Sequence, residues 1–171
     1  TLLHLGPGLA NGLANLHNAK KAHSGIVNIV GEHAIDHIKL NAPLTSDIEG
    51  IARPVSHWVK TSLSSKDIAR DGAEAIAVAK VAPGQIATLI LPGDTAWNEG
   101  TNYDEENITN NLNQVSNQKI ETAAKQLRDA KKPLILVGGS ALEDDNFINI
   151  AKIAEKIGCP VMTDWFNARI D

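Results

Sequence analysis

The sequence predicts an α/β fold in which parallel sheets are flanked by helices, arranged as two partial domains joined by a polar linker. Short runs rich in Ile, Val and Leu alternate with longer segments of helical periodicity. Continuous apolar runs of this kind are typical of parallel strands that helices cover on both faces. The stretch from Pro92 to Ser116 is rich in Gly, Asn, Asp, Glu and Thr, so it provides little apolar surface for a core. We therefore expect a linker over residues 95–117.

The first partial domain, a series of expected strands and helices, occupies residues 1–94. A short strand at its start leads through Gly6-Pro7-Gly8 into a helix that ends at Lys21. A second helix is expected between Ser65, as its N-cap, and Ala82. The expected strands cover residues 2–5, 26–30, 55–60 and 86–91, and residues 41–54 form a loop and a short helix between two of them.

The second partial domain occupies residues 118–171. A helix comes first, and a strand, a Gly138-Gly139-Ser140 turn, a second helix and a second strand follow it. The expected ranges are 119–131, 133–137, 138–140, 146–156 and 158–163. This order is a βαβ unit preceded by a helix.

Composition excludes several classes of function. The chain of 171 residues is 43% hydrophobic and 21% charged, which is typical of soluble globular proteins. Its net charge of −4 without a basic stripe argues against nucleic acid as a partner, and no apolar run is long enough to cross a membrane. A single cysteine, Cys159, excludes an internal disulfide and fits a small buried hydrophobe in a reducing compartment. We expect a cytoplasmic protein.

Both ends of the chain suggest that it is cut from a longer protein. It begins at Thr1 on strand residues, without a methionine and without a secretory signal pattern. It stops at Asp171, soon after the last expected strand.

Gly6-Pro7-Gly8 is the first candidate site. A glycine turn that follows a strand exposes backbone amides and lets a ligand approach closely, because glycine has no side chain. The same turn also serves as a simple strand-to-helix connection, so the sequence leaves both roles open.

Glu32 and His33 form a second candidate, because ligands of open α/β sheets gather at the carboxyl ends of strands. Either side chain could act as an acid or base, and surface hydrogen bonding is the alternative. His33 and His37 are four residues apart and could share a helix face and bind zinc with Asp36, although paired histidines are common in ordinary loops. The remaining histidines show no ligand spacing; they are His4, His17, His23 and His57.

Two motifs of the second half have plain structural alternatives. Gly138-Gly139-Ser140 follows a strand and could present amides to a phosphate, but it lacks the full GxGxxG spacing and a Walker lysine. Asp144 and Asp145 lie where the next helix should begin, and their charges suit capping better than phosphate binding. Asn107-Ile108-Thr109 matches a glycosylation sequon, and we interpret it as part of the polar linker.

Four segments in order resemble the thiamine-diphosphate-dependent enzymes of the acetolactate synthase type, which include benzoylformate decarboxylase, benzaldehyde lyase and pyruvate oxidase. They are Gly6-Pro7-Gly8, Val30-Gly31-Glu32-His33, residues 41–54 and Ala82-Pro83-Gly84-Gln85. Residues 132–139 and 158–161 extend the resemblance into a second domain. It implies that residues 1–94 form the C-terminal half of a pyrimidine-binding domain and that residues 118–171 begin the central domain.

By this resemblance, Gly6, Pro7 and Gly8 would lie against the aminopyrimidine ring of thiamine diphosphate. The family's proton-relay glutamate precedes the strand before this turn and is absent from the chain, and Glu32 is not its counterpart. The magnesium and diphosphate ligands belong to a third domain with a GDG-to-asparagine motif, which is also absent. The resemblance thus assigns no catalytic residue and no metal ligand to the chain. It implies a second subunit of a homo-oligomer and an inactive isolated segment.

Two departures concern the substrate side of the site. Many synthases have Gly-Gln-Val where this chain has Gly31-Glu32-His33, and many have glutamine near Leu44. The resemblance therefore implies cleavage or formation of carbon-carbon bonds in 2-oxo acids or related ketones, with Glu32, His33 and Leu44 as substrate-side candidates. Gly138 and Gly139 fall where flavin-using relatives contact FAD. FAD binding is therefore compatible with the chain, but it is not expected, because non-flavin relatives have similar central domains. The alternative is a non-catalytic nucleotide-binding or oligomerisation module on the same scaffold.

Overall fold

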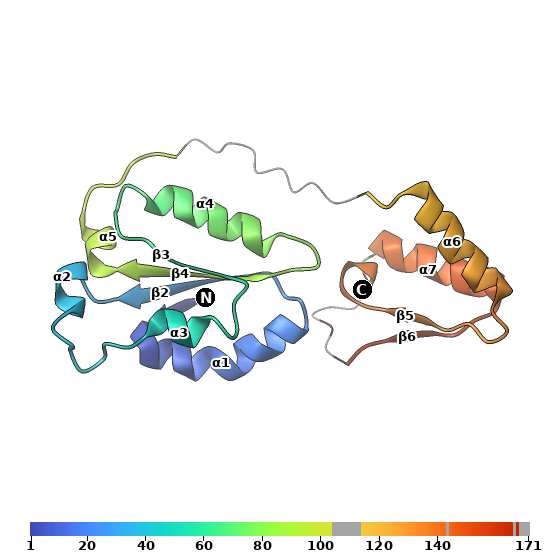
Figure 1. Ribbon diagram of the computed structural model, residues 1–171, viewed down its shortest axis with the longest axis horizontal. Helices are drawn as coiled ribbons and strands as arrows, with labels where there is room; N and C mark the ends of the chain where they lie inside the picture. Colours follow the sequence, from blue (N-terminus) through green and yellow to red (C-terminus); the bar gives the residue numbers. More distant parts are fainter. Residues whose placement is uncertain (104–113, 143, 166, 168–171) are drawn as a thin grey trace. The chain divides into compact units, whose positions relative to one another are not determined.

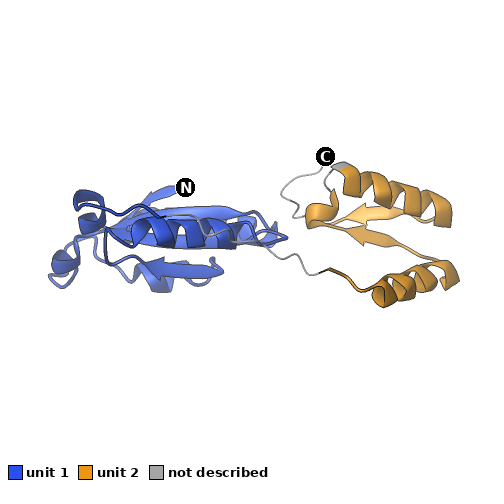
Figure 2. Ribbon diagram, turned by 90° about the horizontal axis from the view of Figure 1, so that it is seen from above, with its two compact units in different colours: residues 1–110 blue, residues 111–171 orange. Residues whose placement is uncertain are grey.

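The protein forms two compact units, residues 1–110 and 111–171, in a computed structural model that describes residues 1–103, 114–142, 144–165 and 167 (Figures 1 and 2). Each unit has its own parallel sheet. The division between the units falls inside the polar segment 95–117. None of the helices among the described residues has the length and apolar character needed to cross a membrane.

A four-stranded parallel sheet forms the centre of unit 1. Its spatial order is β1 (Leu2–His4), β2 (Ile26–Glu32), β4 (Ile86–Pro92) and β3 (Trp58–Thr61). The central strand β4 is buried along Ile86–Ile90, as expected for a continuous apolar run in a sheet covered on both faces. The predicted parallel α/β architecture is confirmed.

Helices cover both faces of this sheet. α1 (Leu5–Lys21) and α3 (Ile48–Ala52) lie on one face and α4 (Ile68–Ala79) lies on the other (Figure 1). The short helices α2 (Ile35–Ile38) and α5 (Gly93–Trp97) lie beyond the carboxyl ends of β2 and β4. The main core cluster joins α1 and α3 to the sheet and consists of Leu9, Leu16, Val30, Ile48, Ala52, Val55 and Ile90.

A chain of buried polar side chains crosses the sheet. Asn28 Nδ2 on β2 donates to Thr88 Oγ1 on β4 over 3.1 Å, and Thr88 Oγ1 lies 2.7 Å from Ser56 Oγ. Thr1 Oγ1 donates to Asn28 Oδ1 over 2.6 Å. Each buried group thus has a partner, which removes the cost of placing it among apolar neighbours.

An ion-pair cluster attaches α4 to β3. Asp71 is almost fully buried, and its carboxylate lies 2.9 Å from Lys60 Nζ and 3.1 Å from Arg70. Lys60 also contacts Glu74 at 3.0 Å. Burial would raise the pKa of Asp71, but hydrogen bonds from Lys60, Ser62 and Arg70 outweigh it and lower the pKa.

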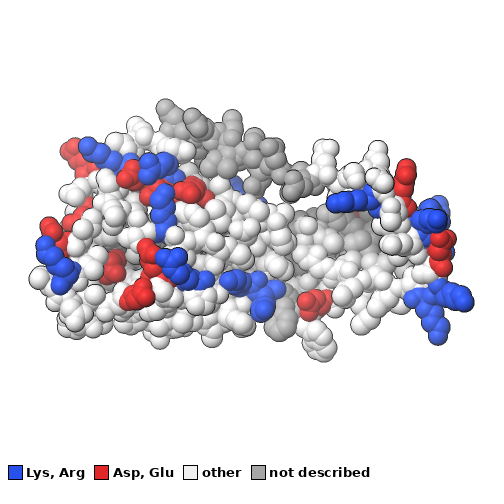
Figure 3. Space-filling model, viewed as in Figure 1, with Lys and Arg blue, Asp and Glu red and all other residues white. Residues whose placement is uncertain are grey.

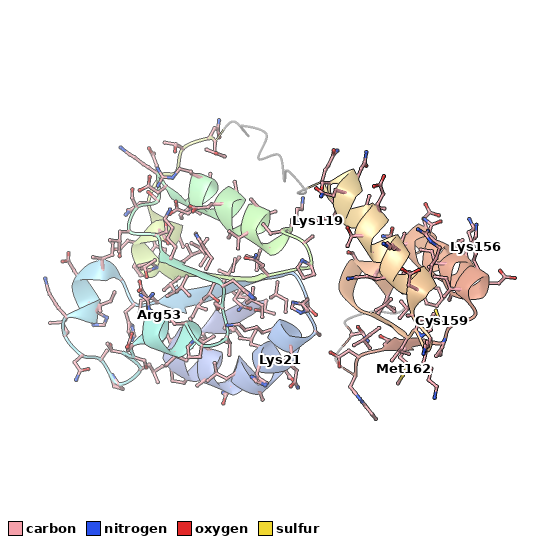
Figure 4. The ribbon with its side chains drawn as sticks, turned by 45° about the vertical axis from the view of Figure 1, so that its right-hand side comes forward. Lys21, Arg53, Lys119, Lys156, Cys159 and Met162 are labelled. Carbon is pink, nitrogen blue, oxygen red and sulfur yellow. The ribbon has the colours of Figure 1, made fainter. Side chains whose placement is uncertain are left out.

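Unit 2 is a βαβ unit preceded by a helix, as the sequence predicts. Its elements are α6 (Asn117–Asp129), β5 (Ile135–Val137), the 3₁₀ helix η1 (Gly139–Leu142), α7 (Asp144–Ile157) and β6 (Val161–Thr163). β5 and β6 pair in parallel with Leu136 opposite Met162, and both of these side chains are largely exposed. Figure 4 shows Met162 on β6. Cys159 is buried and reduced, which confirms its predicted role as a small hydrophobe.

Three local predictions are wrong. α1 already begins at Leu5, so Gly6-Pro7-Gly8 is the first helical turn and not a separate loop, because proline is well accommodated in a first turn. α4 begins at Ile68 rather than after an N-cap at Ser65, whose hydroxyl instead donates to the Glu99 carbonyl over 2.7 Å. β3 begins at Trp58, because Val55 still continues the turn that follows α3.

Candidate functional site

The strand order of unit 1 brings three chain segments to the carboxyl edge of its sheet. His4, the last residue of β1, pairs with Gly31 of β2, and Glu32 pairs with Pro92 of β4. Residues 5–8, 33–38 and 93–97 therefore leave the sheet side by side. This edge is where open α/β sheets bind ligands, and it contains the predicted glycine turn and the predicted Glu32 and His33.

The first turn of α1 depends on having glycine at residue 6. An ideal Cβ on Gly6 would lie 2.3 Å from both Cβ and Oγ of Ser46, in the loop before α3. Leu5 has φ of 55°, a left-handed conformation that non-glycine residues rarely adopt and that is concentrated at functional sites. Gly6 is buried while Pro7 is exposed. The turn is thus held against the loop of Ser46, with the proline ring on the surface.

Gly8 is less constrained than Gly6. Its ideal Cβ would lie 3.4 Å from His4 Cβ, which is an ordinary van der Waals distance. Two glycines of the same motif thus have different physical roles, and only Gly6 is needed for the close approach of the turn to the Ser46 side chain.

Glu32 and His33 both lie at this edge, but they are used differently. Glu32 Oε1 accepts a hydrogen bond from the His33 backbone N–H over 2.7 Å, so this carboxylate folds back on its own chain. The His33 Nε2 atom is buried and has no hydrogen-bond partner among the described residues. A buried imidazole nitrogen without a partner is costly, and a ligand at this edge would supply one.

Leu44 lies on the loop that holds the glycine turn. Its side chain is 41% exposed, and its carbonyl accepts a hydrogen bond from Ser46 Oγ over 3.2 Å. The neighbouring Thr45 Oγ1 is the other buried polar atom that has no partner among the described residues. Asp47 ends the loop by accepting a bond from Gly50 N over 2.8 Å at the start of α3. The loop is therefore well anchored and presents Leu44 to the surface.

Sequence reasoning missed Asp94, which connects two of the edge segments. Its Oδ2 accepts a hydrogen bond from the Ile35 N–H over 2.5 Å, so the first turn of α5 holds the first turn of α2. Asp94 lies two residues after β4, which is a sequence signal for this edge, but its partner is 59 residues away and no local pattern indicates it.

The zinc hypothesis lacks a third ligand. His33 precedes α2 and only His37 is helical, although their rings still meet edge to face at 5.4 Å between centroids. Among the described residues, no group of three or more His, Cys, Asp or Glu side chains could hold a metal ion.

In unit 2 the contacts of the glycine turn are structural ones. Gly139 has φ of 58°, and the Ser140 carbonyl accepts a hydrogen bond from Asn146 Nδ2 over 3.0 Å, which ties the turn to α7. The structure begins α7 at Asp144, where the sequence places the helix start. The sequon Asn107-Ile108-Thr109 lies outside the described residues.

Comparisons with known proteins identify relatives over nearly the whole chain. The chain is 38% identical over 167 residues to the "Putative acetolactate synthase large subunit IlvX" of Mycobacterium tuberculosis, covering 96% of the chain and 32% of that protein. It is 29% identical to the acetolactate synthase of Mycobacterium leprae, covering 92% of the chain and 26% of the relative. The chain thus spans about a third or less of the length of these curated relatives.

Two further matches concern a family model and a solved structure. The model described as CO dehydrogenase beta subunit/acetyl-CoA synthase epsilon subunit matches residues 88–169. The thiamine diphosphate-dependent 4-hydroxybenzoylformate decarboxylase of Rhodococcus jostii RHA1 superposes with a TM-score of 0.83 at 21% identity, covering 95% of this chain and 32% of that one. At this identity the superposition shows a shared fold.

Proposed function

We propose that this chain, which corresponds to a segment of the thiamine-diphosphate-dependent enzymes of the acetolactate synthase type, forms the wall of a thiamine diphosphate site that faces the aminopyrimidine ring. The observation that carries the proposal is the first turn of α1. Gly6 is clamped against Ser46, Leu5 has left-handed backbone geometry, and Pro7 stays exposed at the carboxyl edge of the sheet.

The residues present fit such a ring. A flat heterocycle can pack on the exposed proline ring and on the backbone of glycine, which has no Cβ. Packing of this kind depends on van der Waals contact rather than on side-chain chemistry. Two buried polar atoms lack a partner among the described residues: His33 Nε2 lies at this edge, and Thr45 Oγ1 lies on the loop that holds the glycine turn. A polar ligand there would satisfy groups that the described residues leave unpaired.

We assign the substrate side of the site to Glu32, His33 and Leu44. Thiamine diphosphate stabilises negative charge on carbon while a carbon-carbon bond is formed or broken, and the protein orients the reactants and excludes water. Leu44 offers apolar surface, and the unpaired Nε2 of His33 can exchange a hydrogen bond with a carbonyl or carboxylate oxygen. A 2-oxo acid or a related ketone combines both features.

The rest of the site must come from outside these residues. We place the magnesium and diphosphate ligands and the proton-relay glutamate in other parts of the complete protein, and the opposite wall in a second subunit of a homo-oligomer. The chain alone is then inactive. FAD is not required by this proposal, and the Gly138-Gly139 turn serves unit 2 as a structural element.

The test is a titration of thiamine diphosphate with magnesium into the complete protein that carries this segment. Pro7→Asp puts a charge on the proposed ring-packing surface without disturbing buried atoms, and it should weaken binding about tenfold or more. Pro160→Asp, at another exposed proline, is the matched control and should bind as the parent does. Equal affinity of Pro7→Asp and the parent would refute the assignment, and binding of ADP or FAD without thiamine diphosphate would favour the nucleotide-binding alternative.

A further inference from the structure

A basic cavity lies at the opposite, amino-terminal edge of the sheet in unit 1. It has a volume of about 440 Å³ and is lined by His17, Lys20, Lys21, His23, Pro54 and His57. These residues come from the last turns of α1, the turn into β2 and the connection between α3 and β3. Three histidines that show no ligand spacing along the sequence thus line one cavity.

Two of the lining side chains are fixed by hydrogen bonds to the backbone. Lys20 Nζ donates to the Pro54 carbonyl over 2.9 Å, which holds its ammonium across the cavity. The His57 N–H donates to the Ile86 carbonyl over 2.8 Å, and the Ile86 N–H donates back to His57 Nδ1 over 2.9 Å. Because Nδ1 accepts this bond, Nε2 is the ring nitrogen of His57 that carries a proton and can serve a ligand.

The charges of the cavity have one sign. Five of the six lining residues are lysine or histidine, and none is acidic, although the chain has a net charge of −4. Burial and then the positive charges of Lys20 and His23 lower the pKa of His57. Figure 4 shows Lys21 at the end of α1, where basic atoms gather in the view of Figure 3.

The donor set selects a class of ligand. Ammonium groups and N–H donors repel a metal cation, and the described residues provide no three-residue metal group. The same groups bind tetrahedral oxyanions well, because each oxygen can accept a charge-assisted hydrogen bond. A cavity of this volume is also in the range of small-molecule sites.

We propose that this cavity binds a phosphate dianion, held by the ammonium groups of Lys20 and Lys21 and by the Nε2–H of His57. The dianion is either free phosphate or the phosphate group of a small phosphomonoester. The proposal does not depend on thiamine diphosphate binding, which we place at the other edge of the sheet.

The experiment titrates inorganic phosphate, and separately phenyl phosphate, into the 171-residue chain at pH 7.5 and constant ionic strength. Calorimetry measures affinity, and NMR of the histidine rings locates the site. We expect saturable binding with shifts of the His17, His23 and His57 rings. Tighter binding of phenyl phosphate would identify a phosphomonoester, and tighter binding of phosphate would identify the free ion.

Matched variants separate binding from folding. His57→Asn keeps an acceptor near the position of Nδ1 for the Ile86 N–H but removes the Nε2–H, so affinity should fall about fivefold or more while thermal stability changes little. Lys21→Gln should weaken binding similarly, and Lys66→Gln, at an exposed lysine outside the cavity, should leave it unchanged. The proposal would be overturned if the NMR shifts of the histidine rings rose linearly with phosphate concentration without saturating. It would also be overturned if Lys21→Gln and Lys66→Gln weakened phosphate binding equally.

Discussion

Adding a single methyl group at Gly6 tests whether the first turn of α1 is clamped as the structure shows. In Gly6→Ala the new Cβ would lie 2.3 Å from Ser46 Cβ. Carbon atoms pack at about 3.5 to 4.0 Å, so the turn or the loop must move by more than about 1 Å. Rotation of the serine hydroxyl cannot relieve this contact, because Cβ is fixed to the backbone.

The magnitude follows from two opposing effects. Overpacking of this kind costs about 1 to 3 kcal/mol. Replacing glycine by alanine in a helix raises the free energy of unfolding by about 0.5 to 1 kcal/mol, because the unfolded chain has lower conformational entropy. We therefore expect Gly6→Ala to lower the free energy of unfolding by about 1 to 2 kcal/mol. Gly8→Ala meets its nearest atom at 3.4 Å and should be neutral or slightly stabilising.

Urea denaturation followed by tryptophan fluorescence measures the effect within unit 1. Trp58 is partly buried on β3 and its indole N–H donates to Glu74 over 3.1 Å, whereas Trp97 and Trp165 are 78% and 96% exposed and should change little. Combining Gly6→Ala with Ser46→Gly removes the opposing Cβ, and the two changes should couple by about 1 kcal/mol. The clamp is refuted by a Gly6→Ala protein as stable as Gly8→Ala, or by strictly additive effects in the double variant.

Two further predictions concern polar groups of unit 1. Because the folded-state pKa of Asp71 is lowered, its ion pairs should contribute stability above the unfolded pKa of about 3.9 and lose it as the pH falls through the folded value. Urea titrations between pH 7 and 3 should show that the parent's free energy of unfolding, which is higher than that of Asp71→Asn at pH 7, approaches that of the variant as the pH falls. A difference in the free energy of unfolding that stays constant with pH would contradict this. Thr88→Val leaves Asn28 Nδ2 and Ser56 Oγ without their shared buried partner. Thr88→Val should lower the free energy of unfolding by about 2 kcal/mol in the same urea assay. Thr122→Val, on the exposed face of α6, should change this free energy by no more than about 0.5 kcal/mol.

The architecture could be predicted because it depends on local patterns. Residues 86–91 are apolar except for Thr88, and this pattern places the strand in the middle of a covered parallel sheet without knowledge of its neighbours. The order of the strands is a different matter. β4 lies between β2 and β3, and no periodicity within a strand specifies which partner it takes.

The candidate site could be predicted in its location but not in its contacts. The rule for strand ends places Glu32 and His33 at the carboxyl edge of the sheet, which is where the structure has them. The reason for glycine at residue 6 is its contact with Ser46, which is 40 residues away, and the bond from Ile35 to Asp94 spans 59 residues. Such contacts arise from tertiary packing, so a motif can indicate that glycine matters without showing what it touches.

The helix α1 connects the two proposed sites of unit 1 and also keeps them independent. Its first turn contains Gly6, its last turn contains Lys21, and its 17 residues correspond to a length of about 25 Å. Substitutions separated by more than about 10 Å without shared partners have additive effects on stability. Gly6→Ala and Lys21→Gln should therefore add in a double variant, with the anion affinity of Gly6→Ala equal to that of the parent. A loss of phosphate binding in Gly6→Ala would instead show that the strained first turn affects the packing of the entire helix.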